Sequence, residues 1–515
     1  MKLVSRHIFC QLSGLERCIY NARFQTTEAL IQDDYESLTN AKPFEEIPGH
    51  FSLPLFGTTW TYLPLIGKYN PLKLHEASIL KYKKFGPISR ENITGSYQAV
   101  LVYDPKDMEK VFRQEGKYPS RPGLEILAIY RSMRPDWYKS GGLAVLMGKE
   151  WHEFRTSVQQ TMLRPKSVLN YIGPMDEVAN DMICRIQKLK DVNEEVPDFL
   201  NELYKWALES LATMALNKRL GCLEDKLDPD SRAMQMIRAA HGTFEGMNKL
   251  LFVPLQLWKY IPTRSWKKFV EAQDSFASIA VEEVKQAMES IKNNTDPDRD
   301  LTFIESLLTN KNIDPRDAVT MLLDMLLVGV DTTTHATSFA IYYLAKNPTA
   351  QEKAYTEVSK ILSKGEPITS KIMNELHYLK ACIKESMRIM PIASGTVRAL
   401  DRDIVLSGYR IPAGVVIMFQ NFTACRQEKY FPQADKYLPE RWLTDEKDHH
   451  PFLFLPFGFG RRMCIGRRIA EQEMMLILTK IIQNFRVEYH HEDIDCYSRL
   501  VNVPDKPLRF KFVSR

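Results

Sequence analysis

The sequence lacks several patterns that would indicate a known class of protein. Its eight cysteines form no C-x-x-C pair and follow no regular spacing over 515 residues, which argues against a disulfide framework or a zinc module. A net charge of +5 over that length is too small to indicate a nucleic-acid-binding protein. Residues 142–149 have five residues between their glycines and do not match the phosphate-loop pattern. The sequence contains neither a nucleotide-binding domain nor a flavin module.

The composition is that of a folded globular protein. Apolar residues make up 44% of the chain, aromatic residues 10% and charged residues 26%, which excludes wholesale disorder and a collagen-like chain. Most of residues 151–483 show helical periodicity, whereas residues 99–103 and 415–419 are short apolar runs typical of strands. We therefore predict a mainly α fold with small β-sheets (α+β), arranged as a single domain over residues 45–515.

The N-terminal segment has the composition of a targeting sequence. Up to Gln25 it is basic, amphipathic and poor in acids, and it contains no apolar run long enough for a secretory signal or a membrane span. We expect a mitochondrial transit peptide over residues 1–30. The alternative is the frayed N-terminus of a cytosolic protein.

The clearest helix is predicted to start after Asp314. Asp314 is a good N-cap, Pro315 suits the first helical position, and the helical pattern continues to Asn347 before Pro348. Its apolar stretch, residues 321–330, is interrupted by an acid and is too short to cross a bilayer. We expect this helix to cross a large core, where it can line a buried site.

Residues 457–466, called the cysteine loop below, are the most informative stretch of the sequence. They place Cys464 among Gly458, Gly460 and Gly466, directly before an amphipathic helix. Unpaired N–H groups and the helix dipole at a helix start favour a thiolate, and glycines permit sharp turns and close approach of a flat cofactor. A thiolate ligand to iron needs these conditions. The alternative is a glycine turn with an incidental buried cysteine.

The cysteine loop resembles the haem-binding loop of the cytochrome P-450 family. The match covers six positions, which are Phe457, Gly458, Gly460, Arg462, Cys464 and Gly466. The resemblance implies a haem-thiolate monooxygenase with haem b (iron protoporphyrin IX) as cofactor and O2 as co-substrate. It implies that Cys464 is the axial ligand of the haem iron, that Arg462 pairs with a haem propionate, and that Phe457 packs beside the sulfur.

Glu385 and Arg388 match a second motif of this family. On its own their spacing predicts only a salt bridge on one face of a helix over residues 377–390. The family completes this Glu-x-x-Arg pair with an arginine from a later Pro-Glu-Arg-aromatic loop, and residues 439–442 match that loop. The resemblance implies that Arg441 joins the pair and that the three residues support the cysteine loop structurally.

Polar residues interrupt the apolar face in the middle of the long predicted helix. A threonine there can bond to a preceding carbonyl, so one interpretation is a kink with solvated polar groups. Asp331 and Thr332 also match the acid–alcohol pair that delivers protons through water in this family. Val328 stands where the family usually has a small residue before Gly329, and this departure concerns local packing.

Three further residues match the family's partners of the haem propionates. Trp151 and Arg155 form its Trp-x-x-x-Arg pattern on a predicted helix, and Arg398 follows Pro391. Buried carboxylates need cationic or hydrogen-bonding partners, so a set of such groups is physically reasonable. For each residue taken alone, a surface or interface position is the alternative.

A basic surface near the cysteine loop is predicted from two helices. It consists of Lys380, Lys384, Arg467 and Arg468. These positions resemble those at which mitochondrial members of the family receive an adrenodoxin-type 2Fe-2S ferredoxin, which is reduced by an NADPH-dependent ferredoxin reductase. Ordinary solvated charge is the alternative.

Residues 244–262 are rich in leucine and aromatic side chains, with Lys249 and Lys259 near the ends of the apolar run. A core helix is the default interpretation. In the family, the corresponding region often dips into a membrane. The resemblance therefore implies peripheral membrane contact, with the protein on the matrix side of the inner mitochondrial membrane.

The segments that the resemblance assigns to the substrate pocket are mostly apolar, which suits a large lipid or sterol. They are residues 124–138, Ala336, residues 392–397 and residues 501–503. Three short stretches, residues 130–136, 391–393 and 423–426, are most similar to arthropod ecdysteroid 22-hydroxylases. We therefore predict ecdysteroid 22-hydroxylation in moulting-hormone synthesis. The alternatives are a mitochondrial xenobiotic-oxidising member of the family, a haem-thiolate isomerase and a non-catalytic haem-binding protein.

Overall fold

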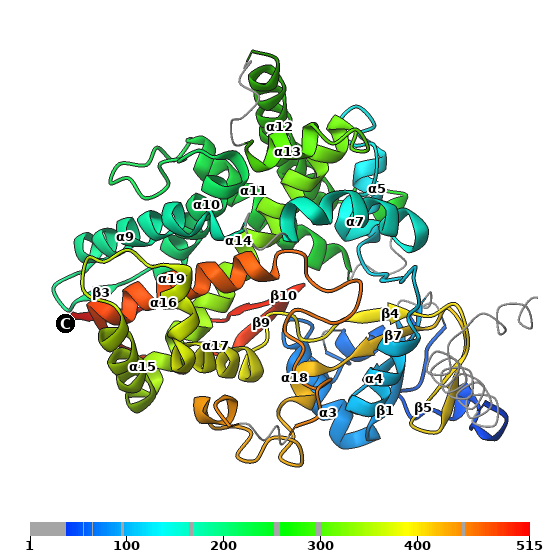
Figure 1. Cartoon of the computed structure of the whole chain (residues 1–515). Coiled ribbons are helices and arrows are strands. Elements are labelled where there is room, and N and C mark those ends of the chain that lie inside the picture. Colours follow the sequence, from blue (N-terminus) through cyan, green and yellow to red (C-terminus); the bar gives the residue numbers. More distant parts are fainter. Residues whose placement is uncertain are drawn as a thin grey trace, which may run out of the picture.

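The computed structural model describes residues 38–515 apart from positions 55, 64, 94–96, 164–167, 252–257, 294–300 and 445–448. The transit peptide predicted over residues 1–30 lies outside these described residues. Within them, no helix is both long enough and apolar enough to cross a membrane. Helices make up most of the fold, and the sheets are small, as the sequence predicts (Figure 1).

The helices follow one another along the chain with short connections. The α-helices are α3 (Leu74–Phe85), α4 (Pro105–Gln114), α5 (Glu125–Ser132), α6 (Gly142–Val145), α7 (Gly148–Leu163), α9 (Ile172–Leu189), α10 (Phe199–Leu216), α11 (Arg232–Leu251), α12 (Arg264–Asn293), α13 (Phe303–Leu308), α14 (Pro315–Lys346), α15 (Pro348–Ile361), α16 (Ser370–Glu375), α17 (His377–Ile389), α18 (Asn421–Ala424) and α19 (Arg467–Asn484). Short 3-10 helices are η1 (Phe44–Glu46), η2 (Thr59–Tyr62) and η4 (Pro439–Trp442).

The largest sheet among the described residues has the strand order β1-β2-β7-β4. Its strands are β1 (Ile88–Ile93), β2 (Tyr97–Val102), β4 (Val397–Ala399) and β7 (Val416–Phe419). The two runs predicted as strands are β2 and β7, which lie side by side in parallel with Ala99 opposite Val416. The smaller sheets pair β5 (Ile404–Leu406) with β6 (Tyr409–Ile411), β9 (Cys496–Arg499) with β10 (Val501–Pro504), and β11 (Phe510–Ser514) with both β3 (Glu195–Val196) and β8 (Phe485–Glu488).

Helix α14 crosses the middle of the helical part of the molecule (Figure 1). It begins as predicted, because the side chain of Asp314 accepts a hydrogen bond from the backbone N–H of Arg316 at 2.9 Å, and Pro315 is the first helical residue. It ends at Lys346, directly before α15. Helices α10, α12, α17 and α19 pack around α14, and most of its residues are buried. The prediction of a central core helix is confirmed.

The hydrophobic core has two parts that meet near the cysteine loop. The larger part joins α9, α10, α11, α12, α14 and α19. The smaller part lies between the four-stranded sheet, α4 and the chain around Phe452. Phe457 packs against the larger part, whereas the ring of Phe459 lies 4.7 Å from that of Phe452 in the smaller part. The loop is therefore held from both sides.

Candidate functional site

The cysteine loop holds Cys464 at the start of α19. Gly458 and Gly460 have φ angles of 73° and 74°, a backbone region that side chains with a Cβ rarely adopt. The N–H of Cys464 donates to the carbonyl oxygen of Phe457 at 2.9 Å, which closes the loop. Gly466 is the N-cap of α19, and its N–H donates to the Cys464 sulfur. A Cβ on Gly466 would meet no atom within 4 Å, so there is open space beside the loop.

The thiol of Cys464 is accessible and yet surrounded by protein. Its residue is exposed by surface area, but burial among neighbouring atoms raises the pKa of the thiol above its usual value. A sulfur that faces an internal space instead of the bulk solvent would show both properties. The N–H of Gly466 and the guanidinium groups of Arg155 and Arg121 act in the opposite direction and favour the thiolate.

One short stretch of α14 is accessible although the helix around it is buried. Val328 is 42% exposed, and Gly329 and Thr332 are partly exposed. Val328 and Thr332 are four positions apart on one face of the helix, and Gly329 adjoins them. The three residues therefore form one continuous accessible patch on α14. The Thr332 hydroxyl donates to the carbonyl oxygen of Val328 at 2.8 Å. A Cβ at Gly329 would lie 2.7 Å from Cδ2 of Leu211, so this glycine permits close packing of α14 on α10.

A cluster of arginines lies close to Cys464. It contains the predicted residues Arg155, Arg398 and Arg462 and one residue that was not predicted, Arg121. Burial, followed by the positive charges of Arg121 and Arg398, lowers the pKa of Arg462 to about 9. Because a guanidinium group keeps its proton at neutral pH, the arginines of this cluster stay charged and repel one another. Arg155 and Arg462 each have a buried Nε without a hydrogen-bond partner among the described residues.

The acids near this cluster do not balance its charge. Glu115 forms an ion pair with Arg398, a member of the cluster, whereas Asp324 is paired with Arg131 outside it. Buried positive charge is costly unless it is paired, so the cluster suits a ligand that brings additional carboxylates. The two propionates of haem b would supply them, and the residues present fit that cofactor.

The arginines also fix the loops around the site. Arg462 lies over the ring of Trp151 at 4.4 Å and donates to the carbonyl oxygen of Leu146. Arg398 donates to the carbonyl oxygen of Phe459 at 3.4 Å. Strand β4 is thereby joined to the cysteine loop, while α7 lies beside it through Trp151. The predicted residues Trp151, Arg398 and Arg462 therefore do come together.

Glu115 and Arg121 were missed by the sequence analysis. A Cβ on Gly460 would lie 2.8 Å from Oε1 of Glu115, so this carboxylate sits directly against the cysteine loop. Arg121 donates to the carbonyl oxygen of Ala144 at 3.2 Å. No local spacing marks either residue, because their partners lie far away in the sequence.

Asp331 and Thr332 are neighbours in sequence, but their side chains have different surroundings. Thr332 belongs to the accessible stretch of α14, whereas Asp331 is only 3% exposed. The hydroxyl of Tyr204 on α10 donates to Oδ1 of Asp331 at 2.8 Å, and Nε2 of His335 lies 3.6 Å from the same oxygen. Burial acts to raise the pKa of Asp331, but His335 and the Tyr204 hydroxyl outweigh it and lower that pKa. The carboxylate is therefore ionised at neutral pH.

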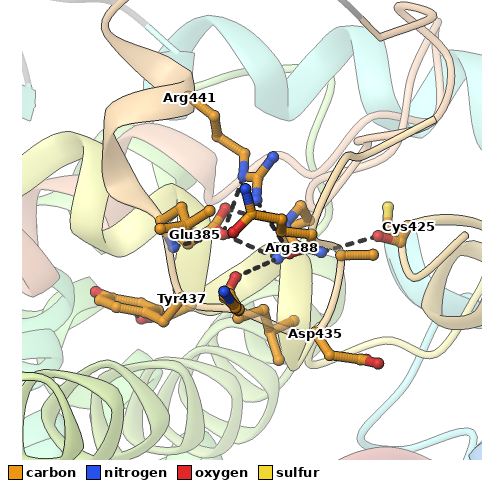
Figure 2. A network of polar contacts seen from close by, with 12 residues as sticks. Glu385, Arg388, Cys425, Asp435, Tyr437 and Arg441 are labelled. Atoms are coloured by element: carbon orange, nitrogen blue, oxygen red, sulfur yellow. Dashed lines mark hydrogen bonds and ion pairs between the residues drawn. The ribbon is translucent and has the colours of Figure 1, made fainter. Parts of the chain in front are cut away.

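Glu385, Arg388 and Arg441 form a buried network that Figure 2 shows from close by. Both side chains of the Glu385–Arg388 pair are fully buried, with an N–O distance of 2.8 Å. Arg441 adds a bond from its Nε to Oε1 of Glu385 at 3.1 Å, and Nε1 of Trp442 donates to Oε2 at 2.9 Å. Arg388 donates to the carbonyl oxygen of Cys425 at 2.9 Å. The network joins α17 to the chain that leads into the cysteine loop.

The predicted basic surface is built from α17 and the start of α19. Arg467 bonds to Glu471 at 3.0 Å, and Glu471 also acts electrostatically on Lys380, so the two helices contribute to one region. Burial, followed by the charge of Lys384, lowers the pKa of Lys380. Arg468 is exposed on α19. Like charges are therefore held close together beside the cysteine loop.

Other cysteines have different environments. Burial raises the pKa of the thiols of Cys222, Cys382, Cys425 and Cys496. Cys496 lies near two other residues of metal-ligand type, with its sulfur 3.4 Å from Nδ1 of His75. The ammonium group of Lys73 already pairs with the third, Asp495, at 2.7 Å. This group is therefore satisfied by its own contacts.

Two of the segments assigned to the substrate pocket, residues 392–397 and 501–503, contact each other although they lie far apart along the chain. The N–H of Asn502 on β10 donates to the carbonyl oxygen of Ile392 at 2.7 Å, and Ser394 bonds to the side chain of Asn502 at 3.0 Å. The ion pair of Arg131 with Asp324 ties α5 to α14.

The apolar stretch over residues 244–262 is described only in part. Helix α11 ends at Leu251, and residues 252–257 lie outside the described part. Tyr260 and Ile261 are 81% and 61% exposed, whereas the ring of Trp258 stacks on that of Trp266 at 5.1 Å. The stretch therefore combines a core contact with exposed apolar side chains.

Comparison with known proteins identifies the family. The family model described as cytochrome P-450 matches residues 51–512. A probable mitochondrial cytochrome P-450 of Drosophila melanogaster, 301a1, is 34% identical and covers 98% of this chain and 94% of its own length. The probable mitochondrial cytochrome P-450 12a5 of the same species is 37% identical over 95% of both chains. Mitochondrial cytochrome P-450 302a1, also from D. melanogaster, is 35% identical over 91% of this chain and 95% of its own. The chain therefore belongs to the cytochrome P-450 family and is a monooxygenase that uses haem b as cofactor and O2 as co-substrate.

Proposed function

We propose that this protein is a mitochondrial haem-thiolate monooxygenase in which Cys464 would ligate the haem iron. The observation that carries the proposal is the accessible thiol of Cys464 next to four arginines that lack enough acidic partners. Cys496 is the rival thiol, but it is fully buried on β9 and contacts His75. Arg121 and Arg155 favour a thiolate at Cys464, whereas Asp495 disfavours one at Cys496.

Bound haem would supply the oxygen chemistry, in which one atom of O2 enters a C–H bond of the substrate and the other leaves as water, with two electrons and two protons consumed. Arg121, Arg155 and Arg462 would offset the charge of the propionates, and Arg398 would complete this set. Trp151 orients Arg462 by lying against its guanidinium group. The N–H of Gly466 stabilises negative charge on the sulfur.

Asp331 and Thr332 deliver the protons. Thr332 is on the accessible stretch of α14 and binds a proton-carrying water there, while Asp331 is ionised and can accept and release a proton. Thr332 is held ready because its hydroxyl bonds to the carbonyl oxygen of Val328. The buried surroundings exclude bulk water from the reaction.

Electrons come from an adrenodoxin-type 2Fe-2S ferredoxin, which an NADPH-dependent reductase reduces. The ferredoxin docks on Lys380, Lys384, Arg467 and Arg468. Two observations support this partner: the relatives named above are mitochondrial by name, and like charges are concentrated at α17 and α19. An acidic partner would relieve this repulsion.

The protein acts on the matrix side of the inner mitochondrial membrane, with residues 1–30 as the import signal. Exposed Leu251, Tyr260 and Ile261 support peripheral contact with that membrane. The substrate is a sterol-like lipid. We favour ecdysteroid 22-hydroxylation, the reaction of the arthropod enzyme called disembodied, because residues 130–136, 391–393 and 423–426 are most similar to it.

The first test is the reduced carbon monoxide difference spectrum of the full-length protein and three variants. We expect a thiolate-type spectrum for wild type, for Cys496→Ser and for the exposed control Cys184→Ser, and its loss in Cys464→Ser. A thiolate-type spectrum in Cys464→Ser would overturn the ligand assignment. Titration with ecdysteroid precursors should shift the ferric Soret band, and absence of any shift across the panel would overturn the substrate class.

A further inference from the structure

A polar network lies behind the accessible stretch of α14, and the proposed mechanism does not yet use it. The Tyr204 hydroxyl on α10 donates to Asp331 at 2.8 Å and lies 2.9 Å from Nε2 of His335. Tyr204 and His335 are 4% and 2% exposed. The ring of His241 on α11 lies edge-on to Tyr204, with centroids 4.2 Å apart. Tyr204 and His335 thus form a short polar track that ends on Asp331, with His241 packed beside it.

The hydrogen bonds of this track have one consistent direction. A tyrosine hydroxyl has one proton to donate and also accepts. With its proton on Asp331, the oxygen of Tyr204 accepts a hydrogen bond from the Nε2–H of a protonated His335 ring. Asp331 Oδ2 and His335 Nδ1 are buried and have no hydrogen-bond partner among the described residues. Asp331 and His335, at the two ends of this chain of hydrogen bonds, therefore each keep one atom that can exchange a further proton.

We propose that Tyr204 and His335 are positioning residues that hold Asp331 and pass to it the protons consumed in oxygen activation. In one transfer, the Tyr204 proton moves to Asp331 Oδ1 while the Nε2 proton of His335 moves to the Tyr204 oxygen. The net change is one proton from imidazolium to carboxylate, with no electron moved. The inference rests on the proposed function, because it requires Asp331 and Thr332 to deliver protons.

The charges around the track set the protonation of its members. His241 faces Asp331, His335, Glu245 on its own helix and Arg499 of β9, and burial is the largest cause that lowers its pKa. Burial and the charge of Asp331 raise the pKa of Tyr204 well above its usual value. Tyr204 is therefore a neutral hydroxyl at every working pH.

The first experiment measures product formed and hydrogen peroxide released per NADPH in the reconstituted holoenzyme between pH 6 and 8.5. Tyr204→Phe and His335→Gln should each lower product per NADPH by about fivefold, since a positioned proton donor contributes at least that much. The control is Tyr342→Phe, which removes a hydroxyl bonded to Asp493 at 3.2 Å on the same helix as His335. Tyr342→Phe should form as much product per NADPH as wild type does.

The pH profile separates proton supply from simple support. His335→Gln should change how coupling depends on pH, because it removes a proton donor from the track, whereas Tyr342→Phe should not. A purely structural role for His335 would lower coupling equally at every pH. Such a result would overturn the inference.

A second readout does not depend on turnover. Histidine-selective NMR of the ferrous carbon monoxide form follows the titration of His241. The pKa of His241 should fall in Asp331→Asn, which removes a negative charge, and rise in His335→Gln, which removes a positive one. If neither variant shifts it, the three groups are not coupled and the inference fails.

Reference variants distinguish this inference from the proposed function. Asp331→Asn and Thr332→Ala should both uncouple electron use from product formation. If they do so while Tyr204→Phe and His335→Gln do not, the relay is wrong and the proton role of Asp331 stands. If Asp331→Asn stays fully coupled, both proposals fall.

Discussion

Glu473 on α19 is a carboxyl group enclosed by helices. Burial raises its pKa to about 8, although Ser210 and Thr333 bond to it and act in the opposite direction. Between the usual pKa of a glutamate and pH 8, the native state keeps a proton that the unfolded state releases. The free energy of unfolding therefore falls as pH rises through this window.

Replacing Glu473 with glutamine should remove that pH dependence. At pH 8.5 we expect Glu473→Gln to be more stable than wild type by about 2–4 kcal/mol, because no buried charge forms. At pH 5 the two proteins should be nearly equal. Denaturant midpoints of the holoprotein at both pH values test this, with Glu492→Gln, an exposed glutamate, as control. Equal midpoint differences at both pH values would contradict the assignment.

Residues of the candidate site differ in how far the sequence predicts them. Cys464 and its glycines lie within ten positions, so their spacing alone indicates the chemistry. His335 lies four residues after Asp331, one helical turn away, and that spacing could have indicated the pair. Tyr204 meets Asp331 across 127 residues, and no local pattern encodes such a contact.

At the scale of elements, the network around Glu385 fixes α17 to the approach of the cysteine loop. Glu385→Ala would leave the fully buried Arg388 without its carboxylate, which costs about 3–5 kcal/mol. The control Asp225→Asn breaks an ion pair with Lys188 that is open to solvent, so it should leave the melting temperature nearly unchanged. Melting temperature and haem content are the measurements. A melting temperature of Glu385→Ala equal to that of wild type would show that the network is dispensable for stability.

The connection between α17 and β4 depends on Gly395. A Cβ there would lie 1.7 Å from the carbonyl oxygen of Phe419 on β7, so the loop and strand must separate. We expect Gly395→Ala to destabilise the protein by at least about 1–3 kcal/mol and to weaken the substrate-induced Soret shift. The control is Gly173→Ala on α9, where a Cβ meets nothing within 4 Å. A normal shift and stability in Gly395→Ala would contradict the predicted strain.

Helix ends were predicted well wherever a cap or proline marks them. Asp314 and Pro315 start α14 in the predicted place, and α14 ends at Lys346, one residue before the predicted end at Asn347 that precedes Pro348. The sequence predicted β2 and β7 as strands but not that they are parallel neighbours, because the facing residues, Ala99 and Val416, lie far apart along the chain. Long-range packing decides which strands pair, and no local pattern encodes it.

At the scale of the whole molecule, the basic surface on α17 and α19 should control electron supply. Lys384→Glu should raise the KM for ferredoxin by about tenfold at low salt and leave kcat nearly unchanged, because it weakens docking and not the chemistry. The effect should shrink as ionic strength rises. Steady-state turnover with purified ferredoxin and reductase measures this, and Lys226→Glu, on another exposed part of the chain, is the control. Equal KM values in both variants would exclude this docking surface.

The arginine cluster beside Cys464 has a consequence for the life of the protein in the cell. Its members repel one another until the carboxylates of a cofactor lie among them, so the chain without haem has a less stable native state than the loaded chain. Binding to the native state alone adds stability in proportion to the logarithm of free cofactor. Proteases remove chains that open often. We therefore expect the abundance of this protein to follow the supply of haem, with degradation selecting against molecules that never received it.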